Sequence, residues 1–431
     1  MPFKKNQLGK IEKAFSLSRA GMNSIIRNFH REMERGLAGK NSSLRMIPAY
    51  VAKPTGEETG KYIALDLGGT NFRILELELK GKGKISPPYE KKFVLEKKYT
   101  SGEGKALFDF IAKCVKNFIF KAGVRHGETC KIGFTFSFPV KQTGIASGIL
   151  VNWTKDFSAR GIEGRDVVGM LSEALQRAGL GQVRVSALVN DTVGTLVARA
   201  YQDKNCDVGL IIGTGTNACY EENLQKIKKW RGPKKIGEKM IVNIEWGNFN
   251  RLPFNLFDKL LDKNSLNPGR QILEKMVSGM YLGEIVRLVL RDCGFVGFSA
   301  AHSFKSEYIS RIEADNSTDL RGVKTFFKKY GSGSLGLEER KMIKSICQLV
   351  TSRAARISAS ALAAVVTKID PALRRKHTVA IDGSVYEKHP GFARQMQQAL
   401  KEIFKTKTKQ LKLVLAKDGS GKGAAIIASL A

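Results

Sequence analysis

Residues 65–73 read Leu-Asp-Leu-Gly-Gly-Thr-Asn-Phe-Arg, and this stretch decides the fold class. The apolar run 62–67 ends at two glycines, and residues 72–79 then alternate apolar with polar side chains. This pattern predicts two antiparallel strands joined by a glycine turn. Because glycine has no Cβ, backbone N–H groups in such a turn can approach phosphate oxygens. A purely structural turn is the common alternative for a single Gly-Gly pair.

The triplet Gly-Thr-Asn recurs at 215–217, again between an apolar strand (208–212) and a second strand-like run. The repetition predicts two related halves that face each other across a ligand cleft. Residues 213–218, Gly-Thr-Gly-Thr-Asn-Ala, also imitate a dinucleotide-binding turn. That motif should open a helix, whereas residues 219–222 are strand-like. We therefore interpret 213–218 as a second phosphate loop.

A third glycine-rich stretch, Asp-Gly-Ser-Gly-Lys-Gly at 418–423, imitates part of a P-loop. The spacing fails, because Ala416 stands where the first glycine of that motif belongs, and Gly423 replaces the magnesium-binding serine or threonine. We expect the start of a helix here.

Along most of the chain the hydrophobic period alternates between that of strands and that of helices, which predicts an α/β fold. A length of 431 residues favours two lobes. Strands are expected at 62–67, 72–79, 92–98, 131–137, 183–189, 208–212, 378–381 and 411–415. Helices are expected at 14–36, 107–120, 166–177, 192–201, 270–293, 337–368, 391–403 and 423–430.

The composition is that of an ordinary globular protein with an excess of positive charge. Lys and Arg outnumber Asp and Glu by 72 to 40, so nucleic-acid binding has to be weighed. The basic clusters at 226–235, 374–377 and 401–412 are scattered and stacking aromatics are sparse, so we expect no nucleic-acid partner. The positive surface could instead concentrate an anionic nucleotide.

No signal sequence or membrane-spanning run is expected, and the six cysteines form no C-x-x-C pair. We therefore predict a cytoplasmic protein with reduced thiols, without structural zinc and without a membrane partner.

Asp191 lies between an apolar strand, 183–189, and an apolar helix. Capping that helix is its ordinary role. Beside two phosphate loops, its carboxylate could instead accept the proton of a hydroxyl that attacks phosphorus. Lys155 could then neutralise charge on the transferred phosphoryl group, although most single lysines are solvated surface charges.

A cluster of amides, carboxylates and short hydroxyls is typical of a sugar pocket, because each sugar hydroxyl needs a donor and an acceptor. Nine residues supply these groups: Ser137, Thr154, Lys155, Asn190, Asp191, Asn217, Glu245, Gln271 and Glu274.

Taken together, these segments resemble the hexokinase family of sugar kinases, within the actin-like ATPase superfamily. The resemblance runs from about residue 43 to the C-terminus, through segments 43–48, 65–73, 133–139, 152–155, 189–194, 213–220, 243–247, 267–269, 274–284, 382–390 and 418–425. It implies phosphorylation of glucose and related hexoses at the 6-hydroxyl, the first step of glycolysis, by a monomer or homodimer. Asp191 would be the general base and the nine polar residues would surround the hexose.

The same resemblance implies ATP with Mg²⁺, the metal carried by the nucleotide without a direct protein ligand and contacted by Asp66 through water. The nucleotide side would comprise Asp66, Gly68, Gly69, Thr70, Asn71, Arg73, Gly213, Thr214, Gly215, Gly383, Ser384 and Val385.

The fold implied by the resemblance is the two-lobed, ribonuclease H-like fold of actin-like ATPases, with a cleft between mixed sheets. The small lobe would be 51–189 plus 417–431, and the large lobe 1–50 plus 190–416. The chain departs from many relatives at 331–339, where a Ser/Thr-Thr-Asp segment is replaced by a glycine-rich one. A sugar-binding regulator without catalysis is the competing class, which the presence of Asp191 and Lys155 disfavours.

Overall fold

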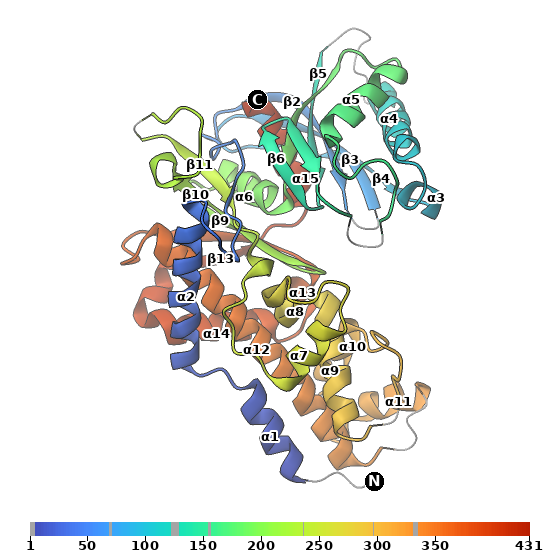
Figure 1. Ribbon diagram of the computed structural model, residues 1–431, viewed down its shortest axis with the longest axis vertical. Coiled ribbons are helices and arrows are strands. Elements are labelled where there is room, and N and C mark those ends of the chain that lie inside the picture. Colours follow the sequence, from blue (N-terminus) through green and yellow to red (C-terminus); the bar gives the residue numbers. More distant parts are fainter. Residues whose placement is uncertain are drawn as a thin grey trace.

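The protein folds into two α/β lobes, which Figure 1 shows one above the other. The computed structural model describes residues 5–68, 71–121, 129–153, 157–235, 237–295, 297–330 and 335–431. The small lobe is built on a five-stranded sheet with the order β4-β3-β2-β5-β8. The large lobe is built on a six-stranded sheet with the order β1-β11-β10-β9-β12-β13. The predicted two-lobed α/β fold is thus confirmed, whereas the residue boundaries predicted for the lobes stay a prediction.

The small-lobe sheet carries helices on both faces. Its strands are β2 (Thr59–Leu67), β3 (Asn71–Lys80), β4 (Tyr89–Val94), β5 (Cys130–Phe136) and β8 (Val183–Val189), beside a hairpin of β6 (Val140–Gly144) and β7 (Ser147–Leu150). Its helices are α3 (Lys97–Thr100), α4 (Gly104–Lys121), α5 (Val167–Arg177) and α15 (Gly419–Leu430). Apolar residues of α4 and α5 form one core with β2 and β5, and α15 packs on β2 and β5 as well.

The large lobe combines its sheet with most of the helices. Its strands are β1 (Ile47–Pro48), β9 (Cys206–Ile212), β10 (Thr216–Asn223), β11 (Lys239–Asn243), β12 (His377–Asp382) and β13 (Leu411–Leu415). Its α-helices are α1 (Lys5–Phe15), α2 (Arg19–Leu37), α6 (Asp191–Gln202), α7 (Leu256–Lys263), α8 (Ile272–Val277), α9 (Gly279–Asp292), α10 (Ser306–Ala314), α11 (Arg321–Lys329), α12 (Leu337–Ile369), α13 (Ser384–Lys388) and α14 (Phe392–Phe404). Three 3-10 turns complete it, η1 (Leu224–Lys226), η2 (Trp246–Asn248) and η3 (Lys405–Gln410).

Both predicted hairpins are present, one in each lobe. β2 pairs with β3 in antiparallel register, with Leu67 opposite Phe72. β9 pairs with β10 in the same way, with Ile212 opposite Thr216. The strand pairs that flank the repeated Gly-Thr-Asn segments are therefore equivalent in the two sheets, as the sequence repeat predicted.

Three predicted elements differ from the structure. The helix expected over 14–36 is broken at Ser18, whose side chain accepts a hydrogen bond from the Gly21 N–H and begins α2. The helix expected over 270–293 is divided into α8 and α9 at Ser278, which has extended backbone. Residues 97–100, expected as the end of a strand, form α3. The apolar spacing continues across the breaks at Ser18 and Ser278, so hydrophobic periodicity alone did not show them.

The 33-residue helix α12 is long and apolar enough to cross a bilayer, which the sequence had not led us to expect, but 83% of its apolar stretch is buried. It lies in the middle of the large-lobe helices in Figure 1 and contacts α2, α9 and α14. We therefore interpret its apolar composition as that of a core helix.

Two helices, α6 and α15, cross between the sheets and join the lobes (Figure 1). Their backbones touch at two glycines, because a Cβ on Gly423 would lie 2.0 Å from the carbonyl oxygen of Gly194. Apolar residues of both helices share one core cluster with Ala64 of the small lobe and Ile241 of the large lobe. The interface between the lobes is therefore a close helix crossing.

Candidate active site

The N-terminus of α6 places the candidate base at the junction of the lobes. Asn190, not Asp191, is the N-cap, and its Oδ1 accepts the Thr192 N–H at 3.0 Å and the Thr192 hydroxyl at 2.6 Å. The capping role considered for Asp191 therefore belongs to Asn190. Asp191 is the first helical residue, where the helix dipole favours a negative charge.

Glu245 is the centre of a polar cluster on the large-lobe side. Its Oε1 accepts a hydrogen bond from Asn243 Nδ2 at 2.9 Å and another from Asn217 Nδ2 at 3.2 Å. Its backbone is left-handed, with φ of 56°, a conformation that non-glycine residues adopt at a cost of roughly 1–3 kcal/mol. Backbone strain at a residue whose carboxylate is held by two amides is typical of a binding site.

The electrostatics place Glu245 near Asp191. Burial raises the pKa of the Glu245 carboxyl, and the charge of Asp191 adds to this effect. The Asn243 and Asn217 amides and the charge of Arg45 oppose it. Two carboxylates that influence each other in this way face a common space.

Glu274 approaches the second glycine loop directly. Its Oε2 accepts the Thr216 N–H at 3.0 Å, and a Cβ on Gly215 would lie 2.8 Å from the same oxygen. The Glu274 carboxylate therefore packs directly against Gly215, a contact that differs from the phosphate contact predicted for this glycine. Gln271 begins α8 with φ of 52° and bonds to Asn267 through its side-chain oxygen.

A small cavity of about 30 Å³ lies between the lobes at these residues. Asn190, Asn243 and Glu245 line it together with Phe136 and Phe138, which end the small-lobe strand β5 and the turn after it. Ser137 lies between those two aromatics and its N–H donates to the Leu67 carbonyl at 3.3 Å. Polar residues of the large lobe and aromatic residues of the small lobe thus line one space, as a sugar pocket requires.

A second and larger cavity, of about 420 Å³, opens beside the second glycine loop. Thr214, Ser384 and Val385 line it, and Met280 and Lys388 complete part of its wall. Gly383 has φ of 119°, and a Cβ there would lie 2.7 Å from the Gly213 nitrogen. The predicted segments 213–215 and 383–385 therefore lie side by side at this cavity.

Asp66 and Arg73 form an ion pair at the first glycine loop. Arg73 Nη2 donates to Asp66 Oδ2 at 2.9 Å, and Ser420 donates its hydroxyl to the same oxygen at 3.0 Å. Arg73 also pairs with Asp418, at the start of α15. Arg73, assigned to the nucleotide side, thus holds two carboxylates at the mouth of the loop.

Asp382 was not among the predicted site residues, although the structure places it with them. Its Oδ1 accepts the Gly383 N–H at 2.7 Å. Burial raises the pKa of the Asp382 carboxyl, and the charges of Asp418 and Asp191 raise it further, against the charge of Arg73. The sequence signal that could have identified Asp382 is its position at the end of strand 378–381, directly before Gly-Ser. Asp66 has a similar position near the end of its own strand.

Several predicted residues cannot be placed. Gly69, Thr70, Thr154 and Lys155 lie outside the described residues, as does the side chain of Asn71. Gly68 follows β2 directly. Within the described ranges, no group of three or more His, Cys, Asp or Glu side chains could hold a metal ion.

Asp382→Asn is expected to raise stability and lower activity. A raised carboxyl pKa favours the folded state below the ordinary pKa of 3.8, and that contribution is lost as the pH rises through the folded-state pKa. At pH 7 the amide should therefore stabilise the protein by about 0.5–2 kcal/mol, with the gain disappearing near pH 3. Thermal unfolding at both pH values checks this, and an equal gain at pH 3 would contradict it.

The two-lobed fold, the polar cavity between the lobes and the paired glycine loops define a phosphotransferase of the actin-like ATPase class. The chain belongs to the hexokinase family, since hexokinase family models match residues 7–201 and 207–430. It catalyses the reaction of that family, the ATP-dependent phosphorylation of hexoses.

Individual relatives agree with this assignment. The chain is 39% identical to a hexokinase of Kluyveromyces lactis, over 98% of this chain and 92% of that protein. It is 41% identical to hexokinase-2 of Oryza sativa subsp. japonica, over 92% of this chain and 85% of that protein. The match to human hexokinase HKDC1 spans 48% of the human protein. The structure of a Schistosoma mansoni hexokinase complexed with glucose superposes with a TM-score of 0.88 at 36% identity, covering 99% of this chain and 98% of that one.

Proposed function

We propose that the protein phosphorylates the 6-hydroxyl of glucose, with Asp191 as the general base. The observation that carries this proposal is the position of Asp191 in the first turn of α6, directly after Asn190, which lines the small cavity between the lobes. The charge of Asp191 acts on Glu245, at the small cavity, and on Asp382, near the large one. A base at that point can take a proton from a hydroxyl bound on one side as the oxygen attacks phosphorus on the other.

The hexose would bind at the small cavity, which must widen to accept it. Glu245, Glu274 and Asn217 would accept and donate hydrogen bonds to its hydroxyls. Closure of the lobes over the sugar would exclude water, so that the nucleotide is not hydrolysed instead. Ser137 and Asn190 approach this space from the small lobe and from the N-terminus of α6, and Lys155 is proposed to neutralise charge on the transferred group.

ATP would occupy the cavity of about 420 Å³, with its base beside Val385 and its phosphates toward Thr214. The carboxylate of Asp382 fits a magnesium ion carried by the phosphates, because burial and the charges of Asp418 and Asp191 make its negative charge unfavourable without a nearby cation. When bound, Mg²⁺ would neutralise the phosphate oxygens. Asp66 would contact it through water, and Arg73 would keep Asp66 and Asp418 in place.

Five of the six cysteines are buried and no disulfide joins them in the described part of the chain, which supports the proposal that the protein works in the cytoplasm. A monomer or homodimer is the proposed assembly.

The activity is tested by incubating the protein with ATP, Mg²⁺ and glucose, fructose or mannose. The expected result is ADP release that depends on the sugar, with phosphorus NMR of the glucose product showing a 6-phosphate. ADP release without sugar phosphate, or a phosphate on another hydroxyl, would contradict the proposal.

Glu245→Gln is expected to raise the KM for glucose about 10–100-fold. A hydrogen bond to a charged group contributes roughly 1.5–3 kcal/mol, and the amide replaces the second carboxylate oxygen, which can accept from a sugar hydroxyl, by an NH₂ donor. Steady-state kinetics at saturating ATP measure the change. Glu238→Gln is the control, at a half-buried residue before β11 whose carboxylate accepts the Lys235 N–H, and it should leave the KM unchanged.

A further inference from the structure

The first connection between the lobes, residues 49–58, runs from β1 to β2. Its beginning lies beside β11, because the Ala49 N–H donates to the Ile241 carbonyl at 2.9 Å and the Ile241 N–H donates to the Val51 carbonyl at 2.8 Å. The connector therefore stays with the large lobe at least as far as Val51.

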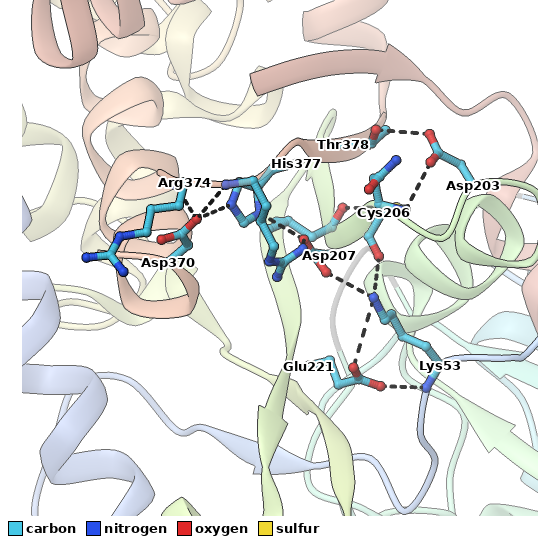
Figure 2. A network of polar contacts seen from close by, with 12 residues as sticks. Lys53, Asp203, Cys206, Asp207, Glu221, Asp370, Arg374, His377 and Thr378 are labelled. Atoms are coloured by element: carbon cyan, nitrogen blue, oxygen red, sulfur yellow. Dashed lines mark hydrogen bonds and ion pairs between the residues drawn. The ribbon is translucent and has the colours of Figure 1, made fainter. Parts of the chain in front are cut away.

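Lys53 fixes the next point of the connector to the large lobe through both its backbone and its side chain. The backbone N–H donates to Glu221 Oε1 at 2.9 Å. The ammonium group donates to Asp207 Oδ1 at 2.9 Å and to the Cys206 carbonyl at 3.1 Å. Figure 2 shows the lysine reaching from the connector toward these groups, and only 17% of its side chain is exposed.

The partner of Lys53 is held in turn by a buried histidine. Asp207 Oδ2 lies 2.8 Å from His377 Nδ1 and 2.7 Å from Arg375 Nη1. His377 Nε2 lies 3.2 Å from Asp370 Oδ2, and the imidazole is 0% exposed (Figure 2). Both ring nitrogens face carboxylate oxygens, and they can donate at both places when each carries a proton. Asp207 is thus fixed from two sides.

The charge on Asp207 is secure at neutral pH. Burial by itself raises the pKa of this carboxyl, but the hydrogen bond from His377 and the charges of Lys53 and Arg375 lower it to about 2. The other charged groups beside Lys53 and Asp207 are Glu221, which also pairs with Lys239, and Asp370. The Lys53–Asp207 pair therefore consists of two charges in little contact with solvent, and such a pair holds its geometry.

Residues of this network lie at the start of β9 and β12, the two strands that lead to the cavity of about 420 Å³. Cys206 and Asp207 start β9, which Gly213 follows, and His377 starts β12, which Gly383 follows. The two strands pair in parallel. A connector tied to their first residues is therefore tied to the same rigid sheet that carries the phosphate loops.

From Gly56 onward the connector is attached to the small lobe and to the end of α6. The Gly83 N–H donates to the Gly56 carbonyl at 2.8 Å, and the Gly81 N–H donates to the Glu58 carbonyl at 3.1 Å. The Tyr201 hydroxyl, at the end of α6, also donates to the Glu58 carbonyl at 2.7 Å. Pro54 lies between the two attachments, and its ring restricts its φ. Thr55 already belongs to the second attachment, because its N–H and its hydroxyl donate to Glu58 Oε1 at 2.7 Å and 2.8 Å.

We propose that Lys53, held by Asp207 and His377, is a positioning residue that anchors this hinge, so that the backbone change of lobe closure in this connection falls between Lys53 and Thr55. The proposal rests on the lobe closure proposed above. Hinges are a few residues that absorb the backbone change of a domain motion, and a fixed point on each side restricts which rotation occurs. With this anchor lost, the open lobes sample more orientations, and the sugar must select the closed one from a wider set.

Lys53→Met tests the anchor, because methionine keeps most of the apolar stem and removes the ammonium group. The expected result is a KM for glucose about 3–10-fold above that of the unaltered protein, with kcat at saturating glucose within about twofold. Saturating sugar restores the closed form, so the turnover of that form is unchanged. Lys53→Arg, which keeps the charge and the donors, should restore at least part of the lost affinity.

The matched control is Lys239→Met. Lys239 pairs with the same Glu221, at 3.6 Å, but it lies on β11 rather than in the connector. Its KM should equal that of the unaltered protein. An unchanged KM in Lys53→Met, or an equal rise in both variants, would overturn the proposal.

Folding of the variants is checked by thermal unfolding. If Lys53→Met fails to fold, Asp207→Asn is used in its place, because it removes the charge and keeps an acceptor, and the same rise in KM is expected. If neither folds while Lys239→Met does, the network serves the fold and the proposal is wrong. Failure of the anchor leaves hexose phosphorylation by the unaltered protein intact, whereas absence of that activity rejects the proposed function itself.

Discussion

Asp191→Asn is expected to lower kcat by about 10²–10⁴-fold, the range for removal of a general base. Asparagine has nearly the same size and can still accept a hydrogen bond from the Thr192 N–H, which Asp191 Oδ1 accepts at 2.8 Å. The start of α6 should therefore be preserved, because its cap is Asn190. Glucose affinity, measured by calorimetry without ATP, should change much less than kcat.

The control for this experiment is Asp292→Asn, which makes the same chemical change at the exposed end of α9. Its kcat should match that of the unaltered protein. Near-normal turnover in Asp191→Asn with intact glucose binding would show that another group removes the proton.

Gly423→Ala is expected to lower the free energy of unfolding by about 3 kcal/mol, as overpacking of a close contact does. The new methyl group would lie 2.0 Å from the Gly194 carbonyl oxygen, so α6 and α15 must move apart. Backbone atoms cannot rotate out of the way as a side chain can. Because α6 carries Asp191, kcat should fall as well.

Gly9→Ala is the control, since it makes the same substitution in a helix where a Cβ meets nothing within 4 Å. It should raise stability by about 0.5–1 kcal/mol through the better helix propensity of alanine. Urea unfolding measures both variants. Equal stability of Gly423→Ala and the unaltered protein would mean that the helix crossing adapts without loss.

The sequence predicted the parts of the fold that follow from local pattern. Both hairpins, at 65–73 and 208–220, were predicted because strand alternation and glycine turns are local signals. The helix start predicted at 418–423 is confirmed, since these residues begin α15 with an N-cap at Asp418. The break at Ser18 was missed, because the apolar positions on both sides of it keep a helical spacing.

The candidate site was predicted through residue type more than through geometry. Polar groups at Asn190, Asn217 and Glu245 converge as expected. The contact between Gly215 and Glu274 could not be predicted from the sequence, because these residues lie on separate elements that meet only in the folded lobe. Asp382 was missed for a similar reason, since the raised pKa that marks it as a site residue depends on the charges of Asp418 and Asp191.

The packing of α15 has a consequence for how the protein is made. This helix is the last in the sequence, yet it lies on β2 and β5, which are formed by residues 59–67 and 130–136. During synthesis at roughly 5–20 residues per second, the small-lobe sheet would wait about 15–60 s for its final helix. Throughout that time one apolar face of the sheet is open to water. A nascent hexokinase chain is therefore expected to need protection by chaperones until residues 419–430 have left the ribosome.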